Sequence, residues 1–314
     1  MAFDSQITRS GAQALIPEDV ANEIIQGAVQ QSTIMRMARK LPNMPRNERR
    51  LPVLSSLIVA GFVTGDTGVK STSSQLWNNK FIEAEELAVI VPVSENVLDD
   101  SAFDIWGEIR PRVEEAFGLA FDAAVLYGTN APTSWPDDIL TGASNAGNAV
   151  TIGTGADLYE DILGEDGVVS LVEQDGFMVT GHIATLNMRG KLRGTRASTG
   201  ELIFQQMPQD PMRYVLDGAP VEFPRNGSMD ASQALLFAGD WDQLVFAIRR
   251  DITFKVLDQA VITDGSNEIV FNLAQQDMVA LRVVMRLGWQ VPNPINRIQT
   301  VEANRFPFGV LTAS

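Results

Sequence analysis

The chain has 314 residues, no cysteine and one histidine, His182, and its formal net charge is −15. These counts exclude disulfide bonds, thiolate nucleophiles and Cys/His zinc sites, and any Ser-His-Asp arrangement would depend on one residue. No apolar run approaches the roughly 18 residues that cross a bilayer, and the polar stretch 1–11 lacks a signal-peptide core, so we expect neither a membrane span nor export.

The region before residue 46 predicts an extended arm and one helix. Residues 1–16 lack periodicity, so we expect an arm that becomes ordered only by contact with another chain. A helix is predicted from Pro17 to near Gln31, because proline suits the first helical position and Glu18 suits the positive end of the helix dipole. The connector that follows is interrupted by prolines, at Pro42, Pro45 and Pro52.

A long polar hairpin comes next, with predicted arms at 50–63 and 75–95. The connection 64–74 is so rich in Gly, Ser and Thr that it cannot pack a core. The second arm passes into a half-buried strand, since apolar residues alternate with period two at Leu87, Val89, Val91 and Val93. A hairpin that cannot bury itself alone needs a partner.

A long helix is predicted from near Asp104 to Tyr127. Ser101 and Asp104 resemble a capping box at its start. Pro111 lies inside, so one bent helix and two collinear pieces are both compatible with the sequence. The apolar face of this helix, which alone would fit any globular core, recurs at steps of three or four residues: Ile105, Ile109, Val113, Phe117, Ala120 and Ala124.

The second half of the chain predicts an α+β unit, and an apolar content of 45% is enough for a sizeable core in one large or two medium domains. Residues 128–155 have the composition of a loop and are the best candidate domain boundary. Gly288 is predicted to break a final antiparallel pair. The elements predicted here are helices at 157–173 and 183–192, a buried strand at 177–180, strands within 230–259, and the final pair at 278–284 and 286–291.

A basic cluster lies between the first helix and the hairpin of this acidic chain. Its interpretation stays open among a solvated basic face, contact with carboxylates of a neighbouring copy, and contact with nucleic acid. Nucleic acid is disfavoured, because no aromatic residue interleaves with these charges and the whole chain repels a polyanion. The basic residues are Arg36, Arg39, Lys40, Arg46, Arg49 and Arg50, and the carboxylates that they could meet are Glu83, Glu85, Glu86, Asp99 and Asp100.

Four patterns point only weakly to a catalytic or modification site. Gly153-Thr154-Gly155 lacks the third glycine and the preceding strand of a dinucleotide fingerprint, so it predicts a tight turn. His182 comes at the start of a predicted helix and is interpreted as structural. Asn226-Gly-Ser228 matches a glycosylation sequon, but without export it indicates only an exposed turn. Acids adjacent in sequence face different directions and form no dyad, as at Glu85/Glu86, Asp99/Asp100 and Asp137/Asp138.

Short phrases in a fixed order connect the chain to a known family. They are Ala14-Leu-Ile-Pro-Glu18, Leu51-Pro-Val53, Val91-Pro-Val-Ser-Glu95, Asp99-Asp-Ser-Ala-Phe-Asp104, Leu126-Tyr-Gly128, Gly218-Ala-Pro-Val221, Gly239-Asp240 and Arg286-Leu-Gly-Trp-Gln-Val291. In this order and spacing the chain resembles the major capsid proteins of tailed bacteriophages, which have the Hong Kong 97 type of shell fold. The resemblance covers almost the whole chain.

The resemblance implies a particular anatomy within an α+β capsid fold. An N-terminal arm with the first helix is expected over 1–45, and an extended loop over 46–82. A peripheral domain with a long spine helix would comprise 83–155 and 295–314. An axial domain, which in this family meets its copies at the five- and six-fold centres of the shell, would comprise 156–294.

The resemblance also implies a structural function that needs no active site, metal or cofactor. Copies of the chain would assemble into pentamers and hexamers of an icosahedral phage head, which encloses double-stranded DNA without sequence-specific binding. The implied location is the virion, after assembly in the cytoplasm of a host bacterium. Two rivals stay open: the shell of an encapsulin-type compartment with protein cargo, and a carboxylate-dependent hydrolase.

Further partners follow from the same resemblance. Only 45 residues precede the hairpin, so a separate scaffolding protein is expected, together with a portal and, as an open alternative, a decoration protein. Some members crosslink a loop lysine to an Asn with the help of a Glu, but no such partners match Lys70 or Lys80, so no crosslink is predicted. Contacts between subunits are expected at Arg36, Arg39, Arg46, Arg49, Arg50, Asp66, Lys70, Trp77, Lys80, Glu83 and Glu85.

Overall fold

The computed structural model describes residues 32–63, 70, 72–100, 104–194, 205–207 and 210–313, with the backbone alone for 205–207 and 210–213. The predicted arm over 1–16 and the predicted helix from Pro17 to Gln31 lie outside these ranges. Asp66 and most of the predicted connection 64–74 lie outside them as well.

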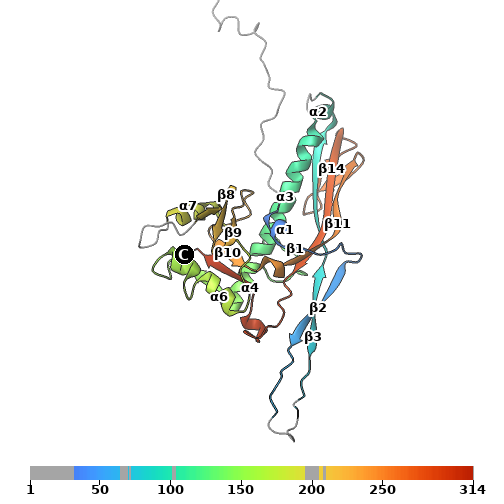
Figure 1. The fold of residues 1–314 in the computed structure, drawn as a ribbon. Helices are drawn as coiled ribbons and strands as arrows, with labels where there is room; N and C mark the ends of the chain where they lie inside the picture. The colour runs from blue at the N-terminus through green and yellow to red at the C-terminus, as the bar shows by residue number, and fades with distance from the viewer. Residues whose placement is uncertain are drawn as a thin grey trace, which may run out of the picture.

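Within the described chain, one long helix lies along a four-stranded sheet (Figure 1). The helix is α3 (Ile105–Tyr127), and the strand order is β1-β11-β14-β4. β1 (Arg39–Lys40) runs parallel to β11 (Val245–Leu257), which pairs antiparallel with β14 (Met278–Gln290). β4 (Glu85–Ser94) completes the sheet antiparallel to β14.

A seven-stranded sheet with the order β5-β15-β10-β6-β9-β8-β7 forms the second unit, to the left of α3 in Figure 1. Its strands are β5 (Ala149–Thr151), β6 (Gly181–Ala184), β7 (Gln205–Met207), β8 (Asp210–Leu216), β9 (Ala219–Glu222), β10 (Ala234–Gly239) and β15 (Phe308–Thr312). The short helices that accompany it are α4 (Ile139–Ala146), α5 (Leu158–Leu163), α6 (Val168–Gln174) and α7 (Leu186–Gly194).

Two antiparallel hairpins stand outside these sheets. One pairs β2 (Glu48–Ser56) with β3 (Leu76–Glu83), and the other pairs β12 (Val261–Thr263) with β13 (Ile269–Asn272). The remaining short elements are helices α1 (Thr33–Met37) and α2 (Glu95–Asp100) and the 3₁₀ turns η2 (Trp241–Gln243) and η3 (Glu302–Asn304).

The spine helix predicted from the sequence is confirmed as α3. Asp104 caps its start, because the carboxylate accepts a hydrogen bond from Gly107 N at 3.0 Å, and Gly128 ends it with a left-handed φ of 66°. Val113 and Phe117 of the predicted apolar face are buried. Pro111 lies inside one continuous helix, so the alternative of two collinear pieces does not apply.

The predicted half-buried strand is confirmed as β4. Its alternate residues Leu87, Val89 and Val91 pack against the core that α3 shares with β11 and β14. The opposite residues face away from α3, because successive side chains of a strand point to opposite faces of the sheet. One face of the long sheet is therefore covered by the spine helix.

The predicted final antiparallel pair at 278–284 and 286–291, broken by Gly288, is wrong, because both segments belong to the single strand β14, which runs through Gly288 without interruption. A side chain at position 288 would overlap the carbonyl oxygen of Glu83, where the base of the hairpin passes over the sheet. Glycine is needed here for the close approach of two backbone segments and not for a turn.

Several predicted boundaries in the second half are wrong. The helix predicted at 157–173 is divided into α5 and α6 by Gly164 and Gly167. The strand predicted at 177–180 lies at β6, and the helix predicted from 183 begins at Leu186. Residues 181–184 form a strand because they pair with β10 and β9 in the middle of the sheet, and this pairing outweighs the local helix preference from residue 183 onward.

The stretch 128–155, predicted as a loop, contains α4 and β5. Asp138 caps α4 by accepting a hydrogen bond from Thr141 N at 2.9 Å, and Gly147 ends it with a φ of 89°. These capping residues mark a helix that the many Gly and Asn residues concealed.

The sheets do not follow the domain boundaries predicted from the sequence. β15 lies within 295–314, which was predicted to join the spine helix, yet it pairs with β10 and β5. β11 and β14 lie within 156–294, yet they pair in the sheet under α3. The chain therefore passes between the two units several times.

Among the helices of the described ranges, none has the length and apolar character that a bilayer span requires.

Candidate assembly surfaces

The hairpin of β2 and β3 extends away from both sheets, as Figure 1 shows at its lower end. Its register runs from Glu48 opposite Glu83 to Leu54 opposite Trp77, which confirms the predicted hairpin. Large apolar side chains along it are left exposed by their own chain: Ile58, Val59, Phe62, Val63, Leu76, Trp77 and Phe81. Trp77 is 65% exposed and Phe62 is fully exposed. Large apolar side chains left exposed together on one element mark a site of protein–protein contact.

The base of the hairpin is fixed to the globule by a small core of its own. Ile82 and Ala84 are fully buried and pack with Met44, Val245 and Ala247. The backbone adds a hydrogen bond from Ala84 N to the oxygen of Asn47 at 2.8 Å. The hairpin therefore leaves the globule in a defined direction.

The C-terminal segment supports the same base. Lys80 Nζ forms an ion pair with Glu302 Oε1 at 2.7 Å, and Arg297 Nη2 donates to the carbonyl oxygen of Ile58 at 2.8 Å. Lys80, predicted to contact another subunit, thus has a partner in its own chain. No local pattern indicates this pair, because the two residues are far apart along the chain.

Two residues of the predicted basic cluster form bonds within the subunit, and the others lie on the surface. Arg36 forms an ion pair with Glu222 at 2.8 Å, and Arg49 donates to the carbonyl oxygens of Pro42 and Asn43 at 2.6 and 3.2 Å. Both residues are partly used within the subunit. The other members remain exposed: Arg39, Lys40, Arg46 and Arg50.

The other predicted contact residues lie at different places. Lys70 is exposed, Glu83 is half-buried, and Glu85 accepts a hydrogen bond from Ser134 Oγ at 2.6 Å. The carbonyl oxygen of Glu83 accepts a hydrogen bond from the indole of Trp135 at 3.1 Å. The structure therefore brings Glu83 and Glu85 together at the base of the hairpin, away from the exposed Trp77.

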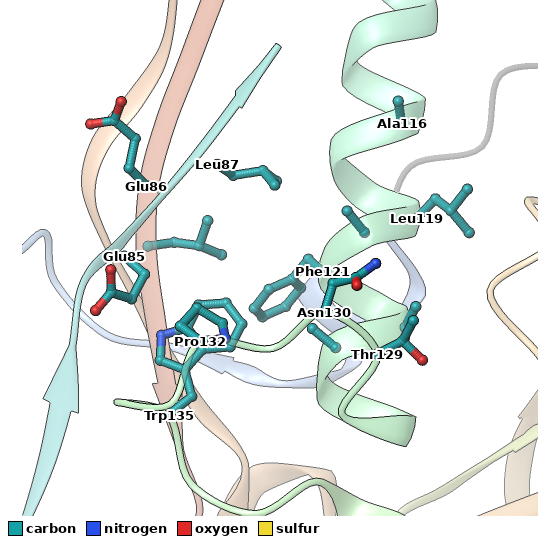
Figure 2. Close-up of a pocket in the computed structure, with 14 residues that line it drawn as sticks. Glu85, Glu86, Leu87, Ala116, Leu119, Phe121, Thr129, Asn130, Pro132 and Trp135 are labelled. Carbon is teal, nitrogen blue, oxygen red and sulfur yellow. The ribbon is translucent and has the colours of Figure 1, made fainter. Parts of the chain in front are cut away.

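A groove between β4 and α3 was missed by the sequence analysis (Figure 2). Its volume is about 370 Å³, and Figure 2 shows Leu87 on the strand side and Ala116 and Leu119 on the helix side. Glu85 and Glu86 lie at the strand-side rim. The groove exists because α3 presents small side chains here; the lining alanines are Ala116, Ala120, Ala123 and Ala124.

A second feature that the sequence analysis missed is the buried carboxylate of Asp122 in α3. It accepts hydrogen bonds from Ser32 Oγ at 2.5 Å, Thr33 N at 2.9 Å, Ile34 N at 3.3 Å and Asn226 Nδ2 at 3.4 Å. Burial raises the pKa of Asp122, against the opposite effect of these hydrogen bonds. The carboxylate ties the start of the described chain to the spine helix.

His182 has a structural environment, although its predicted place at a helix start is wrong. It lies in β6, is fully buried, and its Nε2 lies 3.2 Å from the carbonyl oxygen of Leu216, to which it can donate. Burial lowers its pKa to about 4, so the ring is neutral at physiological pH. In the described part of the chain, no three His, Asp or Glu residues are grouped as metal ligands.

The other weak patterns form turns. Gly153 has a φ of 86°, and Asp161 accepts hydrogen bonds from Gly153 N and Gly155 N at 2.7 and 2.6 Å, which confirms the predicted turn. The sequon residue Asn226 is half-buried and accepts a hydrogen bond from Ser228 Oγ at 2.7 Å. The prediction of an exposed turn is therefore wrong for the Asn226 side chain, which points inward to Asp122.

Comparison with known proteins gives one consistent family. The model of the phage capsid family matches residues 12–301. The major capsid protein of Staphylococcus phage 80alpha is 26% identical over 292 residues, which are 92% of this chain and 85% of that protein.

Two solved structures share the fold over nearly the full length. A chain from Microbacterium phage Oxtober96 is 36% identical, with a TM-score of 0.85 over 99% of this chain and 100% of that chain. A chain from Mycobacterium phage Adephagia is 31% identical, with a TM-score of 0.82 over 99% of each chain.

These similarities confirm the predicted α+β capsid fold of the Hong Kong 97 type. They favour a phage shell over an encapsulin-type compartment and over a hydrolase, and the family is structural, in agreement with the prediction of a non-enzymatic protein. The chain belongs to the phage capsid family, as a structural subunit of a phage shell.

Proposed function

We propose that copies of this chain assemble into pentamers and hexamers, which close an icosahedral phage head around double-stranded DNA. The observation that carries the proposal is the hairpin of β2 and β3, because its apolar side chains have no cover in their own subunit. Laid over a neighbour, the hairpin buries this surface in every copy, and many moderate contacts stabilise a closed lattice.

In this proposal the two sheets have different places in a capsomer. The spine helix α3 and the sheet of β1, β11, β14 and β4 form the peripheral domain. The seven-stranded sheet forms most of the axial domain, which meets its copies at the capsomer centre. The loop 46–82 and the part of the arm 1–45 that precedes Ser32 reach neighbouring subunits, because residues 32–45 pack on their own subunit through Asp122 and the core around Ile34.

Most of the proposed contact residues fall into two groups, those with exposed side chains that can contact a neighbour and those with side chains bonded within their own subunit. Arg39, Arg46, Arg50, Lys70 and Trp77 are exposed and are the first candidates. Four others have a secondary role, because their side chains form hydrogen bonds or ion pairs inside their own subunit: Arg36, Arg49, Lys80 and Glu85. Glu83 is half-buried at the base of the hairpin. Asp66 is a further candidate, because it lies on the predicted loop 46–82.

The proposal includes partners besides the chain itself. A separate scaffolding protein directs assembly in the host cytoplasm, a portal admits DNA, and a decoration protein covers the shell where one is present. The net charge of −15 supports a wall that confines DNA without gripping it, since a cationic lining would bind each phosphate that it met. The finished shell is the virion capsid.

Electron microscopy of the purified protein, alone and with a candidate scaffolding protein, tests this function. We expect closed icosahedral particles, and particles from a phage-producing culture are expected to protect double-stranded DNA from nuclease. A protein cargo in place of DNA would indicate an encapsulin-type compartment. A chain that stays monomeric under all these conditions would contradict the proposal.

The substitution Trp77→Ala tests the hairpin directly. Because Trp77 is 65% exposed, we expect the free energy of unfolding of the subunit to change by less than about 0.5 kcal/mol. A buried interface tryptophan contributes about 2 kcal/mol, so the subunit concentration needed for assembly should rise at least about tenfold. Met178→Ala is the control, since Met178 is a 78% exposed apolar side chain in the segment between α6 and β6, outside the hairpin itself. Equal assembly of both variants would contradict the role of Trp77.

A further inference from the structure

The face of the long sheet opposite α3 carries an unusual set of basic side chains. Arg250 of β11 is paired with Arg286 of β14, and Lys255 is paired with Arg282. Like charges directly opposite one another on adjacent strands destabilise a sheet. We call Arg249, Arg250, Lys255, Arg282 and Arg286 the basic strip.

The strip begins where the cover of this sheet face ends. Met44, Ile82 and Ala84 pack over Val245 and Ala247 at the base of the hairpin. Beyond that point Arg250 and Lys255 are exposed, and Arg282 and Arg286 are half-buried. The strip is therefore an open surface in the isolated subunit.

No carboxylate of the described chain forms an ion pair with any residue of the strip. Instead, Arg249 Nη1 and Arg286 Nη2 both donate to the same neutral acceptor, Asn47 Oδ1, at 2.8 Å each. The Nε atoms of Arg282 and Arg286 are buried without a hydrogen-bond partner among the described atoms. Glu86 is the strand neighbour of Arg286, yet its carboxylate is exposed and does not pair with it. Among the described residues, no anion compensates the charge of the strip.

We propose that the basic strip binds exposed carboxylates of α2 from a second copy of this chain, an inference that rests on the proposed shell function. α2 presents Glu95, Asp99 and Asp100 on the surface and contains no basic residue. Figure 1 shows α2 beside the first turns of the spine helix, at the end of the molecule remote from the β2–β3 hairpin. Guanidinium groups and carboxylates match in geometry as well as in charge.

The same α2 cannot reach the whole strip within one subunit. β14 meets the start of α2 at Met278, which pairs with Ser94. Along a strand that rises about 3.4 Å per residue, Arg286 lies roughly 27 Å from that end, and Arg282 roughly 14 Å. Within the described subunit these acids form no ion pair with the strip, and a second copy can bring them to its centre.

Charge favours this partner over DNA. The chain has 39 acidic and 24 basic residues, so subunits repel one another and a shell needs local opposite charges to offset the repulsion. DNA would meet the same acidic field over a far larger surface, with only a short strip to hold it.

A charge exchange tests the proposal. Arg250→Glu with Lys255→Glu changes the strip at its two exposed members, and Asp99→Lys with Asp100→Lys changes α2. Each double variant is expected to lower the ratio of shell-bound to free subunit by about tenfold on sedimentation, and the quadruple variant should recover to within about threefold of the original chain. A control combines the strip variant with Glu165→Lys and Asp166→Lys, which are exposed acids elsewhere, and should not recover.

The outcomes separate this inference from the shell function. If the original chain forms shells and the quadruple variant recovers no better than the control, the contact with α2 is refuted and the shell function stands. If the strip variant forms normal shells that fail to retain DNA, the strip binds DNA and the inference is refuted. If the original chain forms no shells, the proposed function itself fails.

Discussion

Replacing Asp122 with alanine is expected to lower the free energy of unfolding by about 3 kcal/mol. The carboxylate is fully buried, and it accepts hydrogen bonds from Ser32, Thr33, Ile34 and Asn226. Alanine would leave these donors without a partner inside the protein, and each buried donor without a partner costs about 1–3 kcal/mol before the structure relaxes. The loss is large because this one side chain connects α3 to two other segments, the start of α1 and the turn at Asn226.

Denaturant unfolding of the dissociated subunit measures this effect. Asp104→Ala is a matched control, since Asp104 caps the same helix at an exposed position and its loss should cost about 1 kcal/mol. Amide hydrogen exchange should also increase at Thr33 and Ile34 while β14 stays protected. A loss for Asp122→Ala no larger than that for Asp104→Ala would show that the buried hydrogen bonds do not hold α1.

The pH dependence of Asp122→Asn gives a second readout of the same carboxylate. Burial raises the pKa of Asp122 above its ordinary 3.8, so just above pH 3.8 the folded chain holds a proton that the unfolded chain has released. The contribution of this group to stability therefore falls as the pH rises through that window, whereas asparagine does not titrate. We expect the stability of the original chain relative to Asp122→Asn to decrease from pH 3.8 upward. A constant or increasing difference would contradict the raised pKa.

Periodic patterns in the sequence predicted the elements whose core lies along one face. The spacing of apolar residues was sufficient to predict α3 and β4, because the apolar face of each element packs directly in the shared core. Asp122 follows Phe121 in α3, next to the apolar series, and a charged residue at that place was the available sign of a buried network. Its partners could not be predicted, since Ser32 and Asn226 come from distant parts of the chain.

Glycine and proline were the residues that local reasoning interpreted least well. Pro111 left open one bent helix and two collinear pieces, and the helix is continuous because the core contacts of its apolar face hold both sides of the proline. Gly288 suggested a break in the final pair of strands, because no local pattern shows that another segment passes over it. The ion pair of Lys80 with Glu302 had no local sign either, and the predicted contact of Lys80 with another subunit stays a prediction. These features share one cause, which is contact between segments that are remote in sequence.

The substitution Gly288→Ala is expected to cost about 3 kcal/mol, comparable to the loss of the Asp122 carboxylate. The added Cβ would overlap the carbonyl oxygen of Glu83, which is backbone and cannot rotate away as a side chain can. That oxygen also accepts the hydrogen bond from the indole of Trp135, whose ring packs edge-on against Trp289 at 6.5 Å between ring centroids. Moving it would therefore disturb both the base of the hairpin and the core beneath it.

A thermal and denaturant comparison with Gly190→Ala separates this contact from the general effect of replacing glycine. Gly190 lies within α7, where an added Cβ meets nothing within 4 Å, so alanine there should leave stability unchanged or raise it by up to about 1 kcal/mol. Gly288→Ala should also increase hydrogen exchange at Ala84, whose amide is bonded to Asn47 at the hairpin base. Equal stability of the two variants would mean that the hairpin base can shift without cost. Since Ile82 and Ala84 are fully buried against the sheet, a shift would expose apolar surface, and the direction of the hairpin is set by this packing.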